Sequence, residues 1–207
     1  HELWRQQVSI LDVDDETKSI MLDPNQIDDW LDAHPVEGVA RHFYSCTHTT
    51  FSPNVAEADR RMKTNVIPDQ IDINVDIRTL PGESTAEVQA HLSTALGDLA
   101  DQVEVEIIMN DPASVSQMDN PMWDTIQKAV NQPFPSARLS PQFVVGFTDA
   151  RVYRNLGSVA YGAGLFSPDL KSSDFMSRFH GHNERIDVES LSLTTQFWLD
   201  VCHDFLG

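Results

Sequence analysis

The chain has 207 residues, which is enough for one large domain or two small ones, each with its own hydrophobic core. Its content of 41% hydrophobic and 22% charged residues is that of an ordinary globular protein, but its net charge of −18 is unusual. Because 14 lysines and arginines stand against 32 acidic residues, the composition argues against partners such as nucleic acids or anionic membranes.

Cysteine usage and hydropathy give a second set of expectations. Cys46 and Cys202 lie far apart and form no C-x-x-C pair, so nothing in the sequence implies an oxidising compartment. The chain has no run of about 18 apolar residues and no signal-peptide core at its start. These features favour a soluble, cytoplasmic protein. Since the chain begins without Met inside a helix-like segment, we expect it to be a piece of a longer protein.

The N-terminal third predicts one helix and one strand. Asp23 is a good N-cap and Pro24 suits the first helical position, so a helix is expected that ends before Pro35. Residues 42–51 are rich in aromatic and β-branched side chains, which predicts a strand. The Ser-Pro-Asn sequence at 52–54 is expected to end it.

A regular α+β pattern follows. Residues 71–78 alternate strictly between apolar and polar side chains, which predicts a half-buried strand. Ser84 and Glu87 form a capping box that predicts a helix to about residue 101, and residues 103–107 alternate again as a strand. Residues 40–110 therefore predict the order strand, strand, helix, strand, which is typical of a ferredoxin-like α+β sandwich.

The remaining chain resembles the end of an α/β domain. The sequence Asp-Asn-Pro at 119–121 is expected to start a helix that runs through about Asn131, and a long amphipathic helix is predicted from Asp187. Two short apolar runs at 143–146 and 159–162 predict strands on either side of a turn. We therefore expect two domains, 1–112 and 113–207.

Three separate stretches together resemble one enzyme family. The first is Thr-Asn-Val-Ile-Pro at 64–68 with the alternating strand after it, the second is Gly-Phe-Thr-Asp-Ala-Arg at 146–151, and the third is His-Gly-His-Asn-Glu-Arg-Ile at 180–186. They are similar, in order and spacing, to motifs of the zinc-dependent metallopeptidases related to aminoacylase, carboxypeptidase G, acetylornithine deacetylase and succinyl-diaminopimelate desuccinylase. The resemblance implies a lid or dimerisation domain followed by the end of the catalytic domain.

The resemblance also implies site residues. His180 matches the last zinc ligand of the family, and a neutral imidazole suits zinc. Arg151 matches the arginine that pairs with a substrate carboxylate, although a structural salt bridge is an alternative in so acidic a protein. Asn65 and Arg78 match lid residues that contact the substrate or the active site of the other subunit. Asn65 is equally well explained as a turn residue.

Other polar residues near these motifs have structural interpretations. Asn183 and Glu184 are expected to brace the loop behind the metal ligand, and Asp149 to fix its turn. His182 falls on a variable position of the motif and is expected at the surface. The family uses a lid histidine to stabilise an oxyanion, but that histidine belongs to a glycine–histidine motif that this chain lacks, so a structural role is expected for His48.

The residues that would perform catalysis in this family are absent from the sequence. There is no His-x-Asp motif and no Glu-Glu pair, so no catalytic residue is assigned and two zinc ions are not expected to be fully held by this chain. The resemblance implies a hydrolase of dipeptides or N-acyl amino acids that forms a homodimer through the lid. As the C-terminal part of such an enzyme, the isolated chain is expected to be inactive. A non-catalytic dimerisation or binding module is the alternative.

Overall fold

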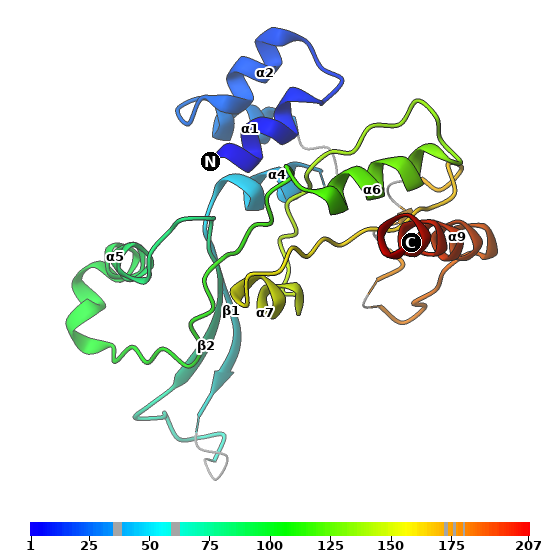
Figure 1. Ribbon diagram of the computed structural model, residues 1–207. Coiled ribbons are helices and arrows are strands. Elements are labelled where there is room, and N and C mark those ends of the chain that lie inside the picture. The colour runs from blue at the N-terminus through cyan, green and yellow to red at the C-terminus, as the bar shows by residue number, and fades with distance from the viewer. Residues whose placement is uncertain (35–38, 59–62, 172–173, 176, 180) are drawn as a thin grey trace. The chain divides into compact units, whose positions relative to one another are not determined.

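The computed structural model describes residues 1–34, 39–58, 63–171, 174–175, 177–179 and 181–207. They form two compact units (Figure 1). The first comprises His1–Ala113 with Phe143–Phe147, and the second Ser114–Gln142 with Thr148–Gly207. Among these residues, no helix is both long enough and apolar enough to span a membrane.

The first unit begins with four short helices that share one core. They are α1 (Glu2–Ser9), α2 (Asp15–Leu22), α3 (Ile27–Ala33) and α4 (Val39–Thr47). Each is amphipathic and turns its apolar side toward the other helices, as burial of nonpolar surface requires. The buried side chains of this core are Trp4, Val8, Met21, Ile27, Leu31 and Cys46.

The helix predicted after Asp23 starts later than expected. The Asp23 carboxylate accepts hydrogen bonds from the Asn25 backbone N–H at 2.9 Å and from the Gln26 side chain, which folds 24–26 into a turn. Helix α3 therefore begins at Ile27 and ends at Ala33. The expected stop before Pro35 falls on a residue outside the described part of the chain.

The strand predicted at 42–51 is wrong over most of its length. Helix α4 occupies it to Thr47, because Phe43 and Cys46, three residues apart, lie on the same face and pack against the core of α1–α3. Tertiary packing thus outweighs the β propensity of the segment. Strand β1 follows as Thr50–Glu57 and runs through Pro53, where an irregularity in the pairing accommodates the proline. The expected break at 52–54 is therefore also wrong.

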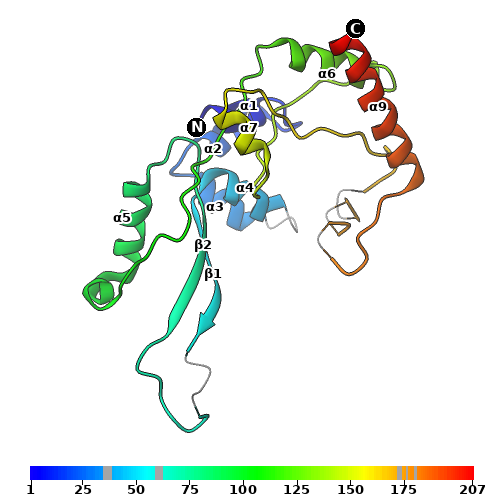
Figure 2. The ribbon, with the colours of Figure 1, turned by 60° about the horizontal axis from the view of Figure 1, so that its bottom comes forward.

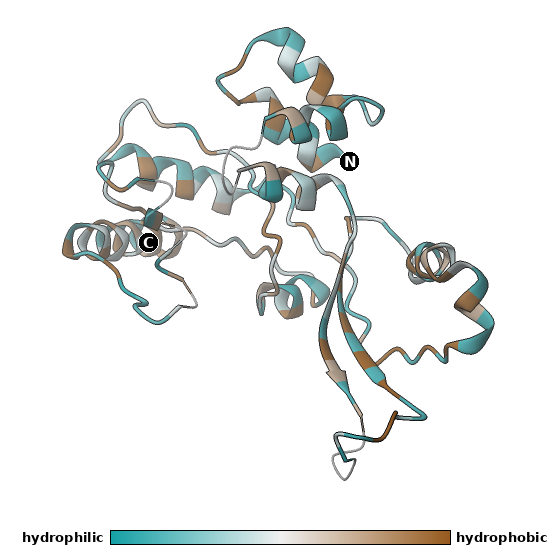
Figure 3. Cartoon of the chain, turned by 180° about the vertical axis from the view of Figure 1, so that it is seen from behind, coloured by the Kyte–Doolittle hydropathy of each residue, from teal (hydrophilic) through white to brown (hydrophobic). Residues whose placement is uncertain are grey.

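Strand β2 (Asp72–Arg78) agrees with its prediction and pairs with β1 as an antiparallel hairpin (Figure 2). The register places Phe51 opposite Ile77 and Pro53 opposite Val75. Apolar residues thus face each other across the two strands (Figure 3). The alternating face is less buried than expected, since Val75 is 39% exposed.

Helix α5 (Thr85–Leu96) begins with the predicted capping box and continues as the 3₁₀ turn η1 (Gly97–Gln102). It contains no buried residue. The strand predicted at 103–107 is wrong: this segment forms no strand, and Val105 and Ile107 are about half exposed. A strand needs a hydrogen-bonded neighbour, and the described sheet contains β1 and β2 alone. The described residues therefore show a two-stranded sheet with helices, not a complete ferredoxin-like sandwich.

The second unit is built on two helices that lie side by side in Figures 1 and 2. They are α6 (Pro121–Asn131), which starts near its predicted position with Asn120 as N-cap, and α9 (Val188–Leu206). A short helix, α7 (Ala150–Asn155), lies between them in sequence. The apolar run at 143–146, which belongs to the first unit, and the run at 159–162 form no strands, contrary to expectation, because no strand of the described residues pairs with them. The buried apolar residues of this unit are Ile126, Ala129, Val130, Phe197 and Val201.

Candidate functional site

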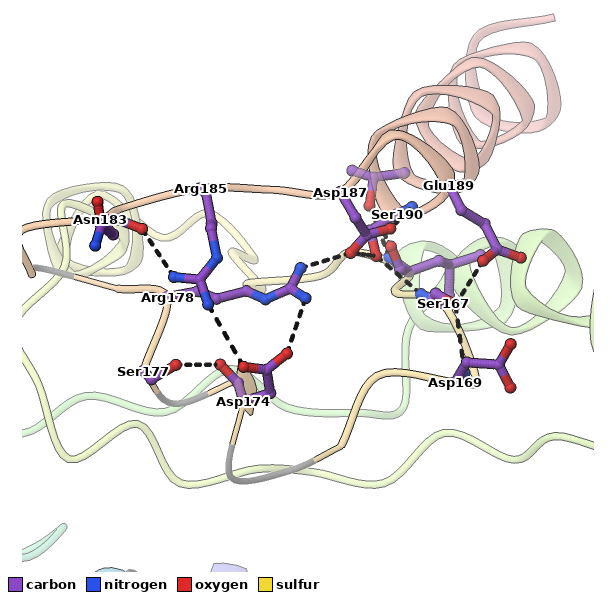
Figure 4. Close-up of polar contacts among 12 residues, drawn as sticks. Ser167, Asp169, Asp174, Ser177, Arg178, Asn183, Arg185, Asp187, Glu189 and Ser190 are labelled. Carbon is purple, nitrogen blue, oxygen red and sulfur yellow. Dashed lines mark hydrogen bonds and ion pairs between the residues drawn. The ribbon is translucent and has the colours of Figure 1, made fainter.

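The loop that carries the His-Gly-His-Asn-Glu-Arg motif is closed at its two ends by an ion pair (Figure 4). Arg178, just before the motif, donates from Nη1 to the Asp187 carboxylate at 2.6 Å. Its Nη2 donates to Asp174 at 3.1 Å, so that one guanidinium binds two carboxylates. The Arg178 side chain is 14% exposed, whereas the side chains of Asp174 and Asp187 are 48% and 32% exposed, so water reaches these bonds from the carboxylate side.

Asp187 connects this loop to helix α9. It is the N-cap of the helix, and its carboxylate accepts from the Ser190 backbone N–H at 2.7 Å and from the Ser190 hydroxyl at 2.8 Å. The backbone hydrogen bond from Ser190 is the main reason that the pKa of Asp187 falls to about 2, with further lowering by the Ser190 hydroxyl and Arg178. The carboxylate is therefore ionised at neutral pH.

A second set of bonds ties the chain before the motif to the same helix end. Ser190 is completely buried, and its hydroxyl accepts from the Ser167 backbone N–H at 2.9 Å. The Ser167 hydroxyl donates to Glu189 at 2.6 Å. One turn further along α9, the Thr194 hydroxyl binds both the N–H and the carbonyl oxygen of Leu165. The 165–167 segment is thus fixed along the first turns of α9.

Three aromatic rings support the region from the apolar side. Phe175 packs edge-on against Phe166, with ring centroids 4.7 Å apart, and against Phe179 at 4.8 Å. Phe179 directly precedes His180 in the sequence. Phe179 is therefore held by ring packing, and Arg178, the residue before it, by its ion pairs with Asp187 and Asp174.

An open, polar pocket of about 660 Å³ lies beside these contacts. Most of its polar groups already have protein partners, as described for Asp187, Glu189 and Ser167. This pattern is that of a structural network that fixes a loop rather than of a preformed ligand site. The lining residues are Ser167, Asp169, Leu170, Lys171, Asp174, Arg178, Asp187 and Glu189.

The predicted ligand His180 lies outside the described residues. Within the described part of the motif, His182, Asn183 and Glu184 are exposed, and the Asn183 carbonyl oxygen accepts from Arg185 at 3.0 Å. No three His, Cys, Asp or Glu side chains come together as a metal site among the residues that the structure describes. The described residues therefore do not themselves supply a set of zinc ligands.

Arg151, the predicted carboxylate-binding residue, is half-buried in the first turn of α7. Asp149 is the N-cap of this helix but makes no side-chain capping bond. On the same helix Arg154 has a structural role, because it donates to the Ser116 hydroxyl at 2.9 Å and to the Ala160 carbonyl oxygen at 2.6 Å. Arg154 therefore fixes Ala160 against the chain at 114–116.

The structure does not bring the two predicted lid residues together. Arg78 lies at the base of the hairpin, where it is 2.7 Å from Asp76 and has its guanidinium over the Phe147 ring at 5.8 Å. Asn65 is exposed in the loop at the other end, beyond the start of β2. The six residue steps of β2 alone separate these ends by about 20 Å.

His48 lies after α4 rather than within a strand. Its ring stacks on Tyr44 with centroids 4.1 Å apart, and its Nε2 lies 3.2 Å from the Asp28 carboxylate on α3. These contacts connect two helices of the first core.

Arg178 is the residue of this region that the motif comparison did not single out. The signal was present in the sequence: an arginine stands two residues before the motif and an aspartate directly after it, and the aspartate precedes a helix. An ion pair between them is what closes a loop of this length.

The sequence model of Peptidase family M20/M25/M40 matches residues 12–204. The chain is 30% identical over 142 residues to the N-fatty-acyl-amino acid synthase/hydrolase PM20D1 of Xenopus tropicalis, which covers 68% of this chain and 27% of that protein. It is 28% identical over 138 residues to the probable carboxypeptidase S-like 2 of Dictyostelium discoideum, which covers 66% of this chain and 26% of the relative.

The human PM20D1 is 29% identical over 139 residues, covering 66% of this chain and 27% of its own length. The chain thus spans about a quarter of the length of the curated relatives that it matches. No solved structure matches it. The match to the family model extends over nearly the whole sequence and includes all three motifs, and the chain belongs to Peptidase family M20/M25/M40.

Proposed function

We propose that this chain is part of a hydrolase that cleaves an amide bond next to a free carboxylate, in dipeptides or N-acyl amino acids. The observation that carries the proposal is the family match over residues 12–204, together with the names of the relatives. One is called a carboxypeptidase and others hydrolases of N-fatty-acyl amino acids, and both substrate classes have an amide bond beside a carboxylate.

Arg151 is the residue proposed to bind that carboxylate. A guanidinium forms two parallel hydrogen bonds to a carboxylate, which an ammonium group cannot reproduce. Its place in the first turn of α7 and its half-buried side chain suit recognition of a charged group. Asn65 and Arg78 are proposed as further substrate contacts of the lid, and their separation along the hairpin implies that they act at different places.

The second part of the proposed site is its metal. We propose that the intact enzyme holds two zinc ions and that His180 is one of their ligands. Bound zinc would act as a Lewis acid toward the scissile carbonyl group. Since the His-x-Asp and Glu-Glu motifs are not in this sequence, the 207-residue chain by itself is proposed to be inactive.

The carboxylate-binding role of Arg151 is tested by comparing two substrates in the longer protein that contains this chain. One is an N-acyl amino acid, and the other is the amide of the same acyl group with an amine that lacks the carboxylate. We expect Arg151→Met to raise KM for the N-acyl amino acid about ten- to a hundredfold, because it removes a charge-assisted contact to the carboxylate. Hydrolysis of the uncharged amide should be unchanged. Arg151→Lys should recover the lost affinity only in part.

The exposed Arg138 provides a matched control, because Arg138→Met removes the same charge from the same unit. An equal loss with both substrates would contradict a role in carboxylate binding. Zinc is tested separately by elemental analysis. About two ions per chain in the longer protein and about none in the 207-residue chain are expected, and stoichiometric zinc in the short chain would contradict the proposal.

A second candidate is a non-catalytic dimerisation module. The exposed apolar side chains of the hairpin, such as Ile73 at 59% exposure, favour an interface with a second copy. The same interface fits the proposed homodimer of an active enzyme. Turnover by the longer protein distinguishes the two candidates, because the module would associate without hydrolysing either substrate.

A further inference from the structure

The ion pair between Arg178 and Asp187 connects the two ends of the loop that carries the motif. Arg178 and Asp187 stand nine positions apart and are joined at 2.6 Å. The chain between them carries the motif, and residues 179 and 181–186 of it are described. Joining the ends of a loop removes much of its conformational freedom.

The second carboxylate of the network strengthens this closure. Asp174 accepts from Arg178 through Oδ2 at 3.1 Å and from Arg185 through Oδ1 at 3.5 Å. Arg185 lies inside the loop and also donates to the Asn183 carbonyl oxygen. One carboxylate before the loop therefore contacts an arginine at its start and another near its end.

The closure is attached to a rigid support. Asp187 caps the 19-residue helix α9, and the middle of this helix is anchored in the core by the buried Phe197. The cap bonds to Ser190 hold the carboxylate in place whether or not Arg178 is present. Arg178 thus binds an acceptor that the cap bonds already hold at the start of α9.

We propose that Arg178 is a positioning residue that holds residues 181–186 in the geometry needed by the site. The proposal rests on the proposed function in taking this loop to be part of that site. Arginine is required because one planar guanidinium donates to two carboxylates in different directions, Asp187 and Asp174. A single exposed ion pair would contribute little, but a network on a nearly buried side chain contributes more.

The ordering of the loop is tested in the 207-residue chain by NMR relaxation. Arg178→Met keeps the length of the side chain and removes both ion pairs. We expect backbone order parameters of residues 181–186 to fall from values typical of ordered backbone to below about 0.6, while those of α6 and α9 stay unchanged. Unchanged order in the loop of a folded Arg178→Met chain would overturn the proposal.

Two further variants separate the closure from a general loss of charge. Lys128→Met removes an exposed ion pair with Asp204 in the same unit and should leave the loop unaffected. Asp187→Asn keeps a good N-cap but removes the charge that Arg178 binds. If both residues act through one bond, the double variant Arg178→Met with Asp187→Asn should loosen the loop no more than Arg178→Met alone. Additive effects would overturn the assignment of the closure to this pair.

The link to activity is tested in the longer protein. Misplacement of a site loop lowers the rate of the bound complex, so Arg178→Met should reduce kcat at least tenfold with a smaller change in KM, and Arg178→Lys should recover part of it. A loosened loop with unchanged kcat would overturn the positioning role. Absence of hydrolysis in the unmodified longer protein would instead contradict the proposed function, and the relaxation measurement would still decide whether Arg178 orders the loop.

Discussion

Arginines connect separate segments in a chain that has few cations. Arg178 joins two carboxylates across the motif loop, and Arg154 joins the 114–116 segment to Ala160. With 32 acidic residues against 14 basic ones, most carboxylates have no cation available. Asp174 and Asp187 are among those that do, and their cation, Arg178, is 14% exposed, whereas the Lys128 side chain that pairs with Asp204 is 65% exposed.

The buried thiol of Cys46 is a second residue whose role the structure clarifies. Its side chain is completely buried, and burial raises the pKa of the thiol to about 12. Its sulfur lies 3.6 Å from His42 Nε2, and burial lowers the pKa of that imidazole. Both groups are therefore neutral at pH 7, so this pair is part of the core of the first unit and not an activated nucleophile.

The lowered pKa of Asp187 implies that the stability of the second unit decreases in acid. The pKa of its carboxyl group is about 2 in the folded chain against an ordinary value of 3.8. A lowered folded-state pKa stabilises the fold above the unfolded-state value, and this contribution is lost as the pH falls from about 4 toward 2. Asp187→Asn retains a capping side chain but does not titrate, so its stability should vary less over this interval.

Urea unfolding of the unmodified chain and of Asp187→Asn is measured at pH 2, 3, 4 and 6, and the difference between their free energies of unfolding is compared across these pH values. Hydrogen exchange of amides in α9 is then measured at the same pH values. The two proteins should differ most at pH 6 and converge toward pH 2. A difference that is constant from pH 2 to pH 6 would contradict the assignment of the lowered pKa to this group.

At the scale of elements, three helix starts were predicted from the sequence, whereas the cap expected at Asp23 and most of the strands were wrong. The capping box of α5 and the caps Asn120 and Asp187 depend on a few adjacent residues, so local sequence specifies them. A strand depends on a partner that is distant in sequence. The segments at 103–107 and 159–162 have suitable side chains, but no neighbouring strand pairs with them in the described residues.

The difference between features set by adjacent residues and features set by distant pairing also applies to the candidate site. The motifs at 146–151 and 180–186 lie within residues 12–204, which match the family model. Whether those residues meet depends on distant pairing, and the hairpin in fact separates Asn65 from Arg78. The roles predicted for Arg151, Asn65, Arg78 and His180, and the two domains expected, remain predictions.

Helix α9 offers a test of where the second unit obtains its stability. Phe197 is 1% exposed and belongs to the same core cluster as Ile126 of α6, whereas Phe205 on the same helix is 45% exposed. Phe197→Ala should lower the free energy of unfolding of this unit by about 3–5 kcal/mol, because it removes buried apolar contacts and leaves a cavity.

Phe205→Ala is the matched control and should cost about 1 kcal/mol or less. Hydrogen exchange of the α6 amides measures both effects on the element opposite the substitution. Equal effects of the two substitutions would mean that the α6–α9 contact does not dominate the stability of this unit.

For the whole molecule, charge and exposed apolar surface act in opposite directions on self-association. The net charge of −18 repels a second copy, particularly at low ionic strength. The apolar residues of the hairpin and of the following segment attract one, with Ile73 at 59% and Ile107 at 47% exposure. Salt shortens the range of the repulsion, from about 30 Å at 0.01 M to about 10 Å at 0.1 M, and leaves the apolar attraction in place.

Association of the chain should therefore increase with salt, which sedimentation velocity measures at several protein concentrations in 0.01 M and 0.5 M sodium chloride. Ile73→Ser should weaken it, since Ile73 and Val75 lie on the same face of β2. Asn74→Ser changes the opposite face of the same strand and should leave association unchanged. If the unmodified chain stays monomeric at both salt concentrations, the hairpin does not bind a second copy, and the proposed dimerisation through this element fails for the isolated chain. If Asn74→Ser weakens association as much as Ile73→Ser does, the contact involves both faces of β2 and does not depend on its apolar side.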